Sequence, residues 1–345
     1  MKKETNYLYL RNLGLILATI ALFIGFLLSN KNFTTLDKIS REKEYTKSYD
    51  KYNTSIKIYS NSKSKAEKAF KEIDKIYEEY FNLSNRYNKD NELYKLNNHE
   101  YKEDAIKINS KLYDMIKYGI TLYDKSNGTI NINNGKIQDI WDSAIKNKKV
   151  PEEKELENID IDIKNIELLE KNKIKNNSNM NINLDSFKYD YINDKVINYL
   201  KKNNIKSFII YSGNNIYTGE YYQGMGNYVV DLKNPDKDNN STFTLVKLSN
   251  KKLSSTGLYE NYFEKDNKVY NHILNDTTKH PVNNMIGVSV ICSLDCNCQA
   301  ESRKLFNLSI NEGRKYVDSN ENLEAVWIFK DDGKLSSLSS THFYD

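Results

Sequence analysis

Residues 182–194 read Ile-Asn-Leu-Asp-Ser-Phe-Lys-Tyr-Asp-Tyr-Ile-Asn-Asp, and this stretch decides the fold. It indicates a phosphate-binding turn that enters a helix, because the free backbone N–H groups at the start of a helix attract anions. The glycines and the lysine that are typical of such turns are replaced here by other residues. The sequence therefore raises two questions: which fold carries this turn, and whether the substituted turn still supports chemistry on a nucleotide.

The chain has 345 residues, enough for one large domain or two medium ones with a substantial buried core. Its 51 basic and 47 acidic side chains are interspersed, and the formal net charge is +4. A protein that follows a phosphate backbone needs its basic side chains gathered in a stripe. This chain has no such stripe in its sequence, so no nucleic-acid partner is expected.

Residues 1–30 have the features of a membrane anchor. The stretch 13–29 is uncharged, and as a helix it would be roughly 26 Å long, close to the lower limit for crossing a bilayer. Lys2, Lys3 and Arg11 precede it, which predicts a cytoplasmic N-terminus and an extracytoplasmic domain. We expect a single-pass protein of the cell membrane, attached by an uncleaved signal anchor. A cleaved signal peptide is the alternative.

Strand and helix signals mix after the anchor without a strict strand–helix–strand repeat, which favours an α+β domain over residues 51–345. Residues 31–50 are polar and lysine-rich and predict a tether. Residues 146–180 predict a charged surface insertion with short strands. The other expected strands are 54–60, 208–211, 228–232, 286–292 and 326–329, the expected hairpin strands are 262–263 and 269–274, and the expected helices are 66–80, 104–123 and 300–308.

Three cysteines, Cys292, Cys296 and Cys298, lie within one short stretch without a neighbouring histidine. This pattern is weak evidence for a metal site, and an odd number of cysteines in an exported protein argues against a disulfide framework. We expect Cys292 to be a buried small side chain. A zinc or redox role for Cys296 and Cys298 is the alternative.

The motifs of this chain occur in the order found in the ApbE family of FAD:protein FMN transferases, which it resembles over about residues 50–340. In that family, the stretch that matches 182–194 reads roughly Ile-Asp-Leu-Gly-Gly-Ile-Ala-Lys-Gly-Tyr-Ala-Val-Asp. The other matching positions are Thr54, Tyr87, Asn91-Glu92, Asn97, Asn127-Gly128-Thr129, Trp141 and the segments 211–216, 254–259 and 270–281. Each match is short, and the specificity comes from their common order and compatible spacing.

The resemblance implies an ApbE-like, T-fold-like domain of mixed, largely antiparallel sheets with packed helices. It also implies that FAD is the substrate and that its pyrophosphate binds near a Mg²⁺ ion. A threonine or serine hydroxyl of an exported or membrane electron-transfer protein attacks, FMN stays esterified to that hydroxyl, and AMP leaves. Such phosphoryl transfer needs in-line placement, neutralised phosphate oxygens and a group that accepts the hydroxyl proton.

The resemblance assigns the proton-accepting role to His272, whose imidazole suits proton transfer near neutral pH. A hydrogen-bonded structural histidine in a hairpin is the alternative for His272. For Tyr191 and Asp194, packing and a solvated helix surface are equally open. The positions carried over for contact with the flavin or its phosphates are Thr54, Glu92, Tyr191, Asp194, Gly213, Thr256, Gly257, Tyr259 and Thr278.

The chain departs from the family pattern at the metal ligands. Gln299 and Arg303 stand where the family has its aspartate and threonine ligands, and Lys188 stands where a backbone carbonyl is the third ligand. Mg²⁺ prefers hard anionic oxygens in an octahedral shell, so we expect no Mg²⁺ to bind in the manner of the family. Asp295 and Glu301 are the acidic residues near enough in sequence to offer substitute ligands.

Two interpretations of these substitutions stay open. In the first, the chain has lost or weakened its transfer activity and serves as a scaffold that binds flavin or a partner. In the second, Arg303 and Lys188 place positive charge where the divalent ion lies, since such clamps stabilise phosphoryl transfer. Asp185 and Tyr189 argue against the second interpretation, because they replace a glycine and the phosphate-binding lysine of the family.

Overall fold

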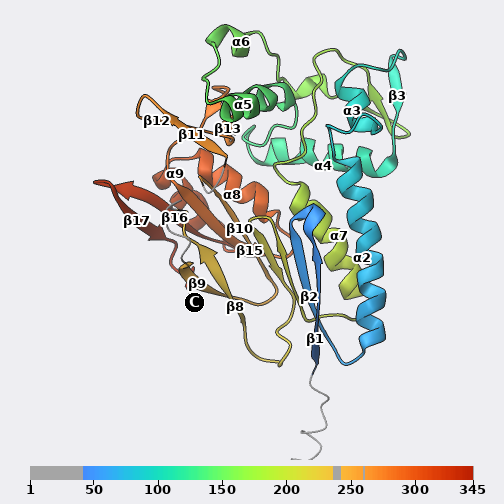
Figure 1. The fold of residues 1–345 in the computed structure, drawn as a ribbon, viewed down its shortest axis with the longest axis vertical. Coiled ribbons are helices and arrows are strands. Elements are labelled where there is room, and N and C mark those ends of the chain that lie inside the picture. The colour runs from blue at the N-terminus through green and yellow to red at the C-terminus, as the bar shows by residue number, and fades with distance from the viewer. Residues whose placement is uncertain (1–41, 236–241, 259–260, 345) are drawn as a thin grey trace, which may run out of the picture. The chain divides into compact units, whose positions relative to one another are not determined.

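The computed structural model describes residues 42–235, 242–258 and 261–344 (Figure 1). The expected membrane anchor, residues 1–30, lies outside the described residues, as does most of the expected tether. Within the described residues, the search for a helix long and apolar enough to cross a bilayer found none. Residues 44–345 group into one compact unit, which corresponds to the expected domain.

One eight-stranded sheet organises the described residues, and its strand order is β1-β2-β6-β7-β10-β15-β16-β17. Neighbouring strands from β2 to β17 are antiparallel, which confirms the predicted α+β class with largely antiparallel sheets. The strands of this sheet are β1 (Lys43–Tyr49), β2 (Thr54–Ser60), β6 (Phe208–Ser212), β7 (Asn215–Thr218), β10 (Lys251–Gly257), β15 (Gly287–Ser293), β16 (Leu323–Asp331) and β17 (Lys334–Ser339).

The helices lie mainly on one face of this sheet (Figure 1). They are α2 (Lys63–Leu83), α3 (Glu92–Asn97), α4 (Ser110–Lys125), α5 (Gly135–Asn147), α6 (Glu153–Glu157), α7 (Lys188–Lys202), α8 (Cys298–Asn307) and α9 (Ile310–Asp318), with the short 3-10 turns η1 (Asp50–Tyr52) and η2 (Ile163–Asn165). The helices α5 and α9 were not predicted, whereas α2 and α8 confirm the periodicity seen in the sequence. Ser62 caps α2, because its side chain accepts a hydrogen bond from the backbone N–H of Lys65.

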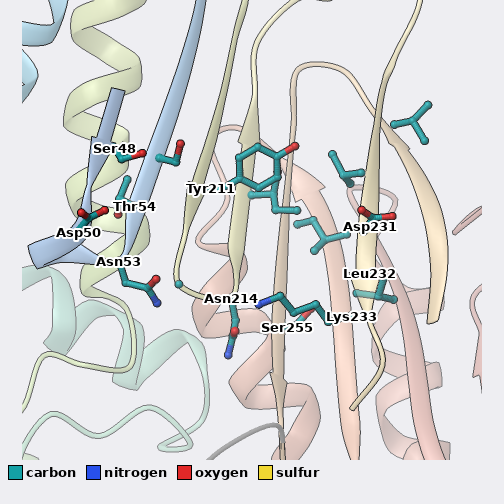
Figure 2. Close-up of a pocket in the computed structure, with 16 residues that line it drawn as sticks. Ser48, Asp50, Asn53, Thr54, Tyr211, Asn214, Asp231, Leu232, Lys233 and Ser255 are labelled. Carbon is teal, nitrogen blue, oxygen red and sulfur yellow. The ribbon is translucent and has the colours of Figure 1, made fainter. Parts of the chain in front are cut away.

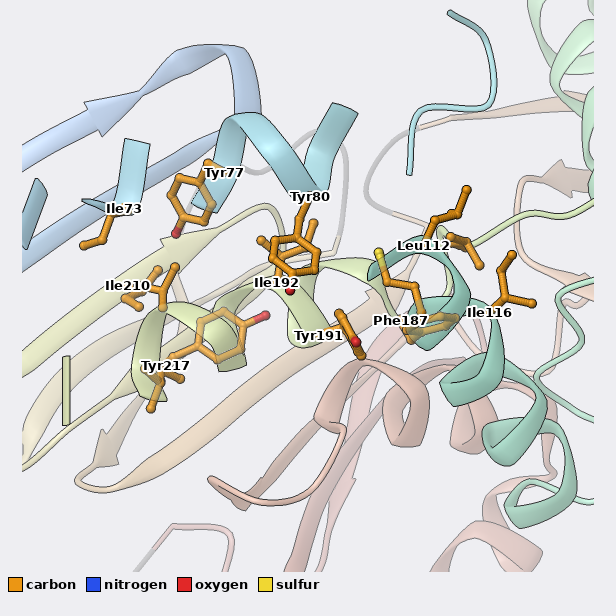
Figure 3. Close-up of a cluster of buried hydrophobic side chains, with 14 of the residues drawn as sticks. Ile73, Tyr77, Tyr80, Leu112, Ile116, Phe187, Tyr191, Ile192, Ile210 and Tyr217 are labelled. Carbon is orange, nitrogen blue, oxygen red and sulfur yellow. The ribbon is translucent and has the colours of Figure 1, made fainter. Parts of the chain in front are cut away.

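The main core forms where α2, α4 and α7 pack against the first strands of the sheet (Figure 3). From α2, Ile73 and Tyr77 point toward α7, and Ile210 and Tyr217 reach it from the sheet. The Tyr77 hydroxyl donates to Asn193 Oδ1 at 2.6 Å, so the buried phenol has its polar atom satisfied. This packing fixes α7, the helix that follows the opening motif, against the sheet.

The opposite face of the sheet is partly covered by a two-stranded ribbon, β8 (Tyr228–Lys233) with β9 (Thr242–Leu248). Alternate residues of β8 are buried and exposed, as the sequence predicted for this strand. Its inward side chains, among them Val230 and Leu232, pack on Ile209 and Ile291 of the sheet. The strand β15 is therefore covered on both faces, which explains its continuous apolar sequence.

Three smaller sheets lie beyond the large one and its ribbon. The hairpin of β11 (Tyr262–Lys265) and β12 (Lys268–Asn271) confirms the predicted turn at Asp266-Asn267, and both turn residues have positive φ. A short pair joins β13 (Leu274–Asn275) to β14 (His280–Pro281). The third sheet has the order β3-β5-β4, with β3 (Ala105–Lys107), β5 (Lys173–Lys175) and β4 (Leu168–Leu169).

The structure differs from the predicted helix over 104–123. Residues 105–107 form β3 instead, because Ile106 pairs with Ile174 of the insertion. The helix α4 begins at Ser110, where the Asn109 side chain accepts a hydrogen bond from the N–H of Lys111. A strand with its partner about seventy residues away has no local signal, and the helical periodicity was extended over it.

The predicted tether over 31–50 is also too long. Residues 43–49 form the edge strand β1, in which Tyr45 and Tyr49 contact the core. Lys47 pairs with Asp74 of α2 at 2.6 Å, so the polar composition of this strand reflects its position at the edge of the sheet. The insertion, residues 146–180, contains α6 and η2 as well as the short strands that were expected.

Candidate functional site

The opening motif is a turn followed by a helix, as the sequence predicted, and side chains from other elements hold its backbone. Asn97 exchanges two hydrogen bonds with the backbone of Ile182, at 2.8 and 2.7 Å. Asn183 Oδ1 accepts from the N–H of Asp185 at 3.0 Å, which tightens the turn before α7. The turn therefore has a defined backbone although it lacks glycine.

Gln299 ties the first turn of α8 to this motif. Its Nε2 donates to the backbone carbonyl of Asp185 at 2.9 Å, and its Oε1 accepts from the N–H of Asp190 at 3.3 Å. Both ends of the amide are thus used to join two segments that are 114 residues apart. A carboxylate at this position could not donate to the carbonyl, so the amide fits a contact made without a metal.

Lys188 at the start of α7 forms an ion pair with Asp185, with 2.5 Å between Nζ and Oδ1. Burial raises the pKa of Asp185, but Lys188, Arg86 and Arg303 outweigh it, and the net pKa is lowered. Burial lowers the pKa of Lys188, and its attraction to Asp185 outweighs that effect and raises the pKa. Both groups are charged at neutral pH, and each largely neutralises the other.

Arg303 is half-buried one helical turn after Gln299, so the two side chains lie on the same face of α8. In the described part of the chain its guanidinium has no hydrogen bond and no ion pair within 4 Å. Burial lowers the pKa of Arg303, and the carboxylates of Asp276, Asp185 and Asp142 oppose that shift. Arg303 thus lies in the field of three carboxylates without a direct contact to any of them.

His272 lies between β12 and β13, within reach of the charge of Arg303. Burial and the guanidinium of Arg303 lower the pKa of His272 to about 4, so the imidazole is neutral at pH 7. Its Nδ1 is buried and has no hydrogen-bond partner among the described residues. The backbone carbonyl of His272 accepts from Gln138 Nε2 at 3.2 Å, which positions the loop but leaves the ring nitrogen available.

Thr256 at the end of β10 belongs to a chain of hydroxyl groups that sequence reasoning missed. Its Oγ1 is 2.8 Å from the Oγ of Ser302 on α8, which is 3.1 Å from the Oγ of Ser254. Ser254 in turn donates to Asn215 Oδ1 at 2.6 Å. The Thr256 hydroxyl is half-buried and lies next to Arg303 in sequence through Ser302, which places β10 beside the charged face of α8.

Gly213 occupies the two-residue turn between β6 and β7, where Ser212 pairs with Asn215. Its φ of +60° lies in the left-handed region that glycine adopts at low cost, as a tight hairpin turn of this length requires. Its N–H donates to the carbonyl of Asn53 at 2.9 Å. The Thr54 hydroxyl is already engaged, at 2.7 Å from the Ser212 hydroxyl.

A cavity of about 560 Å³ opens between the β8–β9 ribbon and the sheet (Figure 2). Tyr211 and Ser255 lie on its floor, β8 forms one side, and Asn53 and Asp50 lie at the opposite side. The cavity adjoins Thr54 and Gly213 but does not include Arg303 or His272 among its lining residues. It is therefore separate from the charged face of α8.

A second cavity, of about 230 Å³, lies at the start of α7 and combines aromatic with cationic side chains. Phe81 stacks on Tyr52 with 4.6 Å between ring centroids and meets the ring of Tyr189 at 5.4 Å. Lys188 and Arg86 line the same cavity. Rings and cations together suit a molecule with an aromatic heterocycle and phosphates.

Other predicted positions have mainly structural contacts in the described part of the chain. The Glu92 carboxylate accepts from the N–H of Asn109 at 2.9 Å. Tyr191 is buried among aromatic rings, with the Tyr118 ring 5.2 Å away. Thr278 lies exposed in the turn before β14, Gly257 is buried at the end of β10, and Tyr259 lies outside the described residues.

Sequence reasoning missed the buried lysine that pairs with Asp194. Lys252 of β10 is fully buried, 2.7 Å from Asp194 Oδ1 and 3.6 Å from Asp190 Oδ2, and it donates to the carbonyl of Cys296 at 2.7 Å. The Tyr217 hydroxyl completes the group by donating to Asp190 at 2.7 Å. Burial raises the pKa of Asp194 to about 6 although Lys252 lowers it.

Lys279 occupies the glycine position of the family motif and keeps a left-handed backbone, with φ of +60°. Its Nζ donates to the carbonyls of Leu156, Glu157 and Ile159 at 2.8 to 3.2 Å. The carbonyl of Lys279 accepts from Trp141 Nε1 at 2.9 Å. These bonds join the insertion to the loop that carries His272 and help to offset the strained backbone.

The metal predicted to be absent from this site finds no suitable ligands around Gln299. Gln299 and Arg303 supply no anionic oxygen, and the carbonyl of Asp185 is already bonded to the amide, so these residues do not fit Mg²⁺. Asp295 and Glu301 line a different, smaller cavity. Cys292 and Cys298 are buried free thiols, and no cluster of potential metal ligands occurs in the described residues.

Comparison with known proteins agrees with this geometry. The model of the ApbE family matches residues 52–327. The FAD:protein FMN transferase of Vibrio cholerae is 25% identical over 280 residues, 79% of this chain and 82% of that protein. The FAD:protein FMN transferase of Klebsiella pneumoniae is 27% identical over 166 residues, 48% of this chain, and the match spans about half, 51%, of that protein.

Solved structures have the same fold. The ApbE protein of Thermotoga maritima aligns with a TM-score of 0.74 at 19% identity, over 88% of this chain and 99% of that one. The flavin transferase ApbE of Vibrio cholerae aligns with a TM-score of 0.71 at 19% identity, over 88% and 98%. Because the family model covers most of the sequence and the fold agrees, this chain belongs to the ApbE family.

Proposed function

We propose that this protein transfers FMN from FAD to a threonine or serine hydroxyl of an exported or membrane electron-transfer protein. The observation that carries the proposal is the meeting of three segments at the start of α7: the turn with Asp185, the charged face of α8 and the loop with His272. The aromatic and cationic cavity next to Lys188 offers a place for a flavin nucleotide. Membership of the ApbE family supports this choice of substrate.

The proposed step is a displacement at phosphorus. The acceptor hydroxyl oxygen forms a bond to the FMN phosphorus, and the bond from that phosphorus to the bridging oxygen of the pyrophosphate breaks. AMP leaves with the electron pair of that bond, and the proton of the hydroxyl passes to a base. The protein contributes mainly position and charge, because phosphoryl transfer needs little covalent help from side chains.

His272 is the proposed base. Its pKa of about 4 means that it is unprotonated at neutral pH and can accept a proton without first losing one. The buried, unpartnered Nδ1 is available for such a proton. A low pKa also makes the imidazole a weak base, so we expect it to act as the negative charge of the phosphates approaches and raises its basicity.

We also propose that residues 13–29 anchor the protein in the cell membrane and that the described domain lies on the extracytoplasmic side. The support is the uncharged stretch itself and the Lys2, Lys3 and Arg11 side chains before it. An extracytoplasmic domain would meet flavin-accepting redox proteins of the membrane directly. Protease protection in intact spheroplasts tests this, because a cytoplasmic domain would stay uncleaved.

The decisive test of the transfer uses the full-length chain, FAD and an acceptor protein that the Vibrio cholerae transferase flavinylates. We expect a covalent mass increase of one FMN on the acceptor and release of AMP, both absent in His272→Ala. His280→Ala is the matched control, since His280 pairs with Glu153 at the surface of the insertion. No adduct from this chain beside an active Vibrio enzyme would rule out the transfer.

A second candidate function is a scaffold that binds flavin without transferring it. The substitutions at the metal positions favour it, because Gln299 closes the site with an amide bond to the Asp185 carbonyl. The two functions differ in one measurement. A scaffold binds FAD, as fluorescence titration would show, but leaves it intact in the presence of the acceptor.

A further inference from the structure

We propose that the guanidinium of Arg303 replaces the divalent cation of this site and binds a phosphate of FAD directly. The inference rests on the proposed function, which it deepens by naming the group that neutralises the phosphate. It predicts a member of the ApbE family whose nucleotide site works without metal. Three features of the structure carry it.

The first feature is that the space for the metal is closed. Gln299 Nε2 donates to the Asp185 carbonyl at 2.9 Å, and its Oε1 accepts from the Asp190 N–H at 3.3 Å. A cation at this point would have to displace the amide from both bonds and would meet the positive charge of Arg303. The amide thus holds α7 and α8 together in the way that a shared metal ligand would.

The second feature is that the neighbouring cations are committed and Arg303 is not. Lys188 is paired with Asp185, and Arg86 is buried with two hydrogen bonds to Asp139. Lys252 is fully enclosed by Asp190 and Asp194. The guanidinium of Arg303, by contrast, has no hydrogen bond or ion pair to any of the described residues. A half-buried cation without a direct partner is suited to an anion from outside.

The third feature is that the surrounding carboxylates hold Arg303 in position without using its hydrogen bonds. Asp142 belongs to α5, Asp185 to the turn before α7, and Asp276 to the loop between β13 and β14. Attraction from three sides restrains the side chain over the site. The carboxylates also oppose an incoming phosphate, but Asp276 has a pKa of about 6, raised by burial, and can take up a proton when the phosphate binds.

The chemistry of the guanidinium fits this role. Its planar fork donates two parallel hydrogen bonds to two phosphate oxygens, and it keeps its charge at every physiological pH. Lysine would supply a point charge without the fork. Because Arg303 is on the same face of α8 as Gln299, one helix would position both the closing amide and the phosphate clamp.

Binding experiments test the clamp without relying on catalysis. The full-length chain is titrated with FAD and, separately, with riboflavin, which has no phosphate, in the presence of EDTA and then of excess Mg²⁺. We expect FAD to bind equally well in both conditions. Arg303→Ala should weaken FAD binding about tenfold or more and leave riboflavin binding unchanged, and Arg303→Lys should fall between. Arg314→Ala, an exposed arginine on α9, is the matched control.

Transfer measured on the same samples separates this inference from the proposed function. Adduct formation in EDTA that drops about 10²- to 10³-fold in Arg303→Ala supports both. Transfer by the wild type only with Mg²⁺ overturns the Arg303 inference and keeps the transferase. FAD binding that depends on Arg303 without any adduct keeps the clamp and overturns the transferase. Equal binding of FAD by Arg303→Ala and the wild type overturns the clamp, and a wild type that binds no FAD overturns both.

Discussion

Two cationic centres lie along the contact between α7 and α8, and they differ in how completely their charges are paired. Lys252 is fully buried and is bonded to Asp194 and to the carbonyl of Cys296, with Asp190 close by. Arg303 is half-buried among carboxylates and bonded to none of the described residues. Complete pairing marks a centre that stabilises the fold, and incomplete pairing marks one that can bind a ligand.

The largest expected effect comes from breaking the paired centre. Lys252→Met removes the cation and leaves Asp190 buried without its countercharge, so we expect the free energy of unfolding to fall by about 3–5 kcal/mol. Denaturant titration at pH 7 measures this. Lys251→Met, on the exposed neighbour in β10, should change stability by less than about 0.5 kcal/mol. Equal effects in the two variants would contradict the assigned role of Lys252.

Lys279 offers a second paired cation, with a backbone cost added. Lys279→Ala loses the three hydrogen bonds to the insertion and keeps the left-handed backbone, so we expect a loss of about 1–2 kcal/mol. Lys279→Gly loses the same bonds but relieves the strain, and should be about 1 kcal/mol more stable than the alanine variant. Thermal unfolding of the two variants side by side decides this, and an alanine variant at least as stable as the glycine variant would refute it.

The unpaired centre can be sharpened by titrating His272. The positive charge of Arg303 helps to hold the pKa of His272 at about 4, so Arg303→Gln should raise that pKa toward the ordinary value of about 6.5. Burial keeps part of the shift, so the increase is expected to be partial. NMR titration of the imidazole signals measures it, and the chain has only four histidines to assign. A pKa that stays unchanged would separate the two side chains.

The smallest expected effect is the pH dependence of FAD binding. Burial raises the pKa of Asp276 to about 6, while Arg303 and the Asn134 amide lower it. Above pH 6 the ionised Asp276 repels the phosphates, and below pH 6 its protonation removes that repulsion, so FAD affinity should increase a few-fold from pH 8 to pH 5.5. Asp276→Asn should flatten this dependence in fluorescence titrations. A wild type with equal affinity at both pH values would exclude Asp276 from the site.

The sequence predicted the elements whose signals are local. The alternation in β8, the apolar run of β15 and the turn before α7 all appear where they were expected. The ordered motifs also predicted the family. These features follow from the period of buried side chains and from backbone conformations that particular residues favour, and both can be recognised in a single segment of sequence.

Some features had no local signal. The strand β1 looks like a polar tether because it lies at the edge of the sheet, and β3 looks like the start of a helix. Lys252 in an exposed position would have read the same in the sequence as it does when fully buried. Such cases depend on neighbours that come from distant segments, so periodicity alone could not identify them.

The sequence by itself determined the fold family and the substitutions at the metal positions, because residue identities and their order are written in the chain. Only the tertiary structure decided which substituted charges cancel. It pairs Lys188 with Asp185, bonds Gln299 to a carbonyl 114 residues away, encloses Lys252, and leaves Arg303 without a direct partner. The physical reason is that electrostatic pairing depends on distance and burial in space, and neither can be calculated from spacing along the chain.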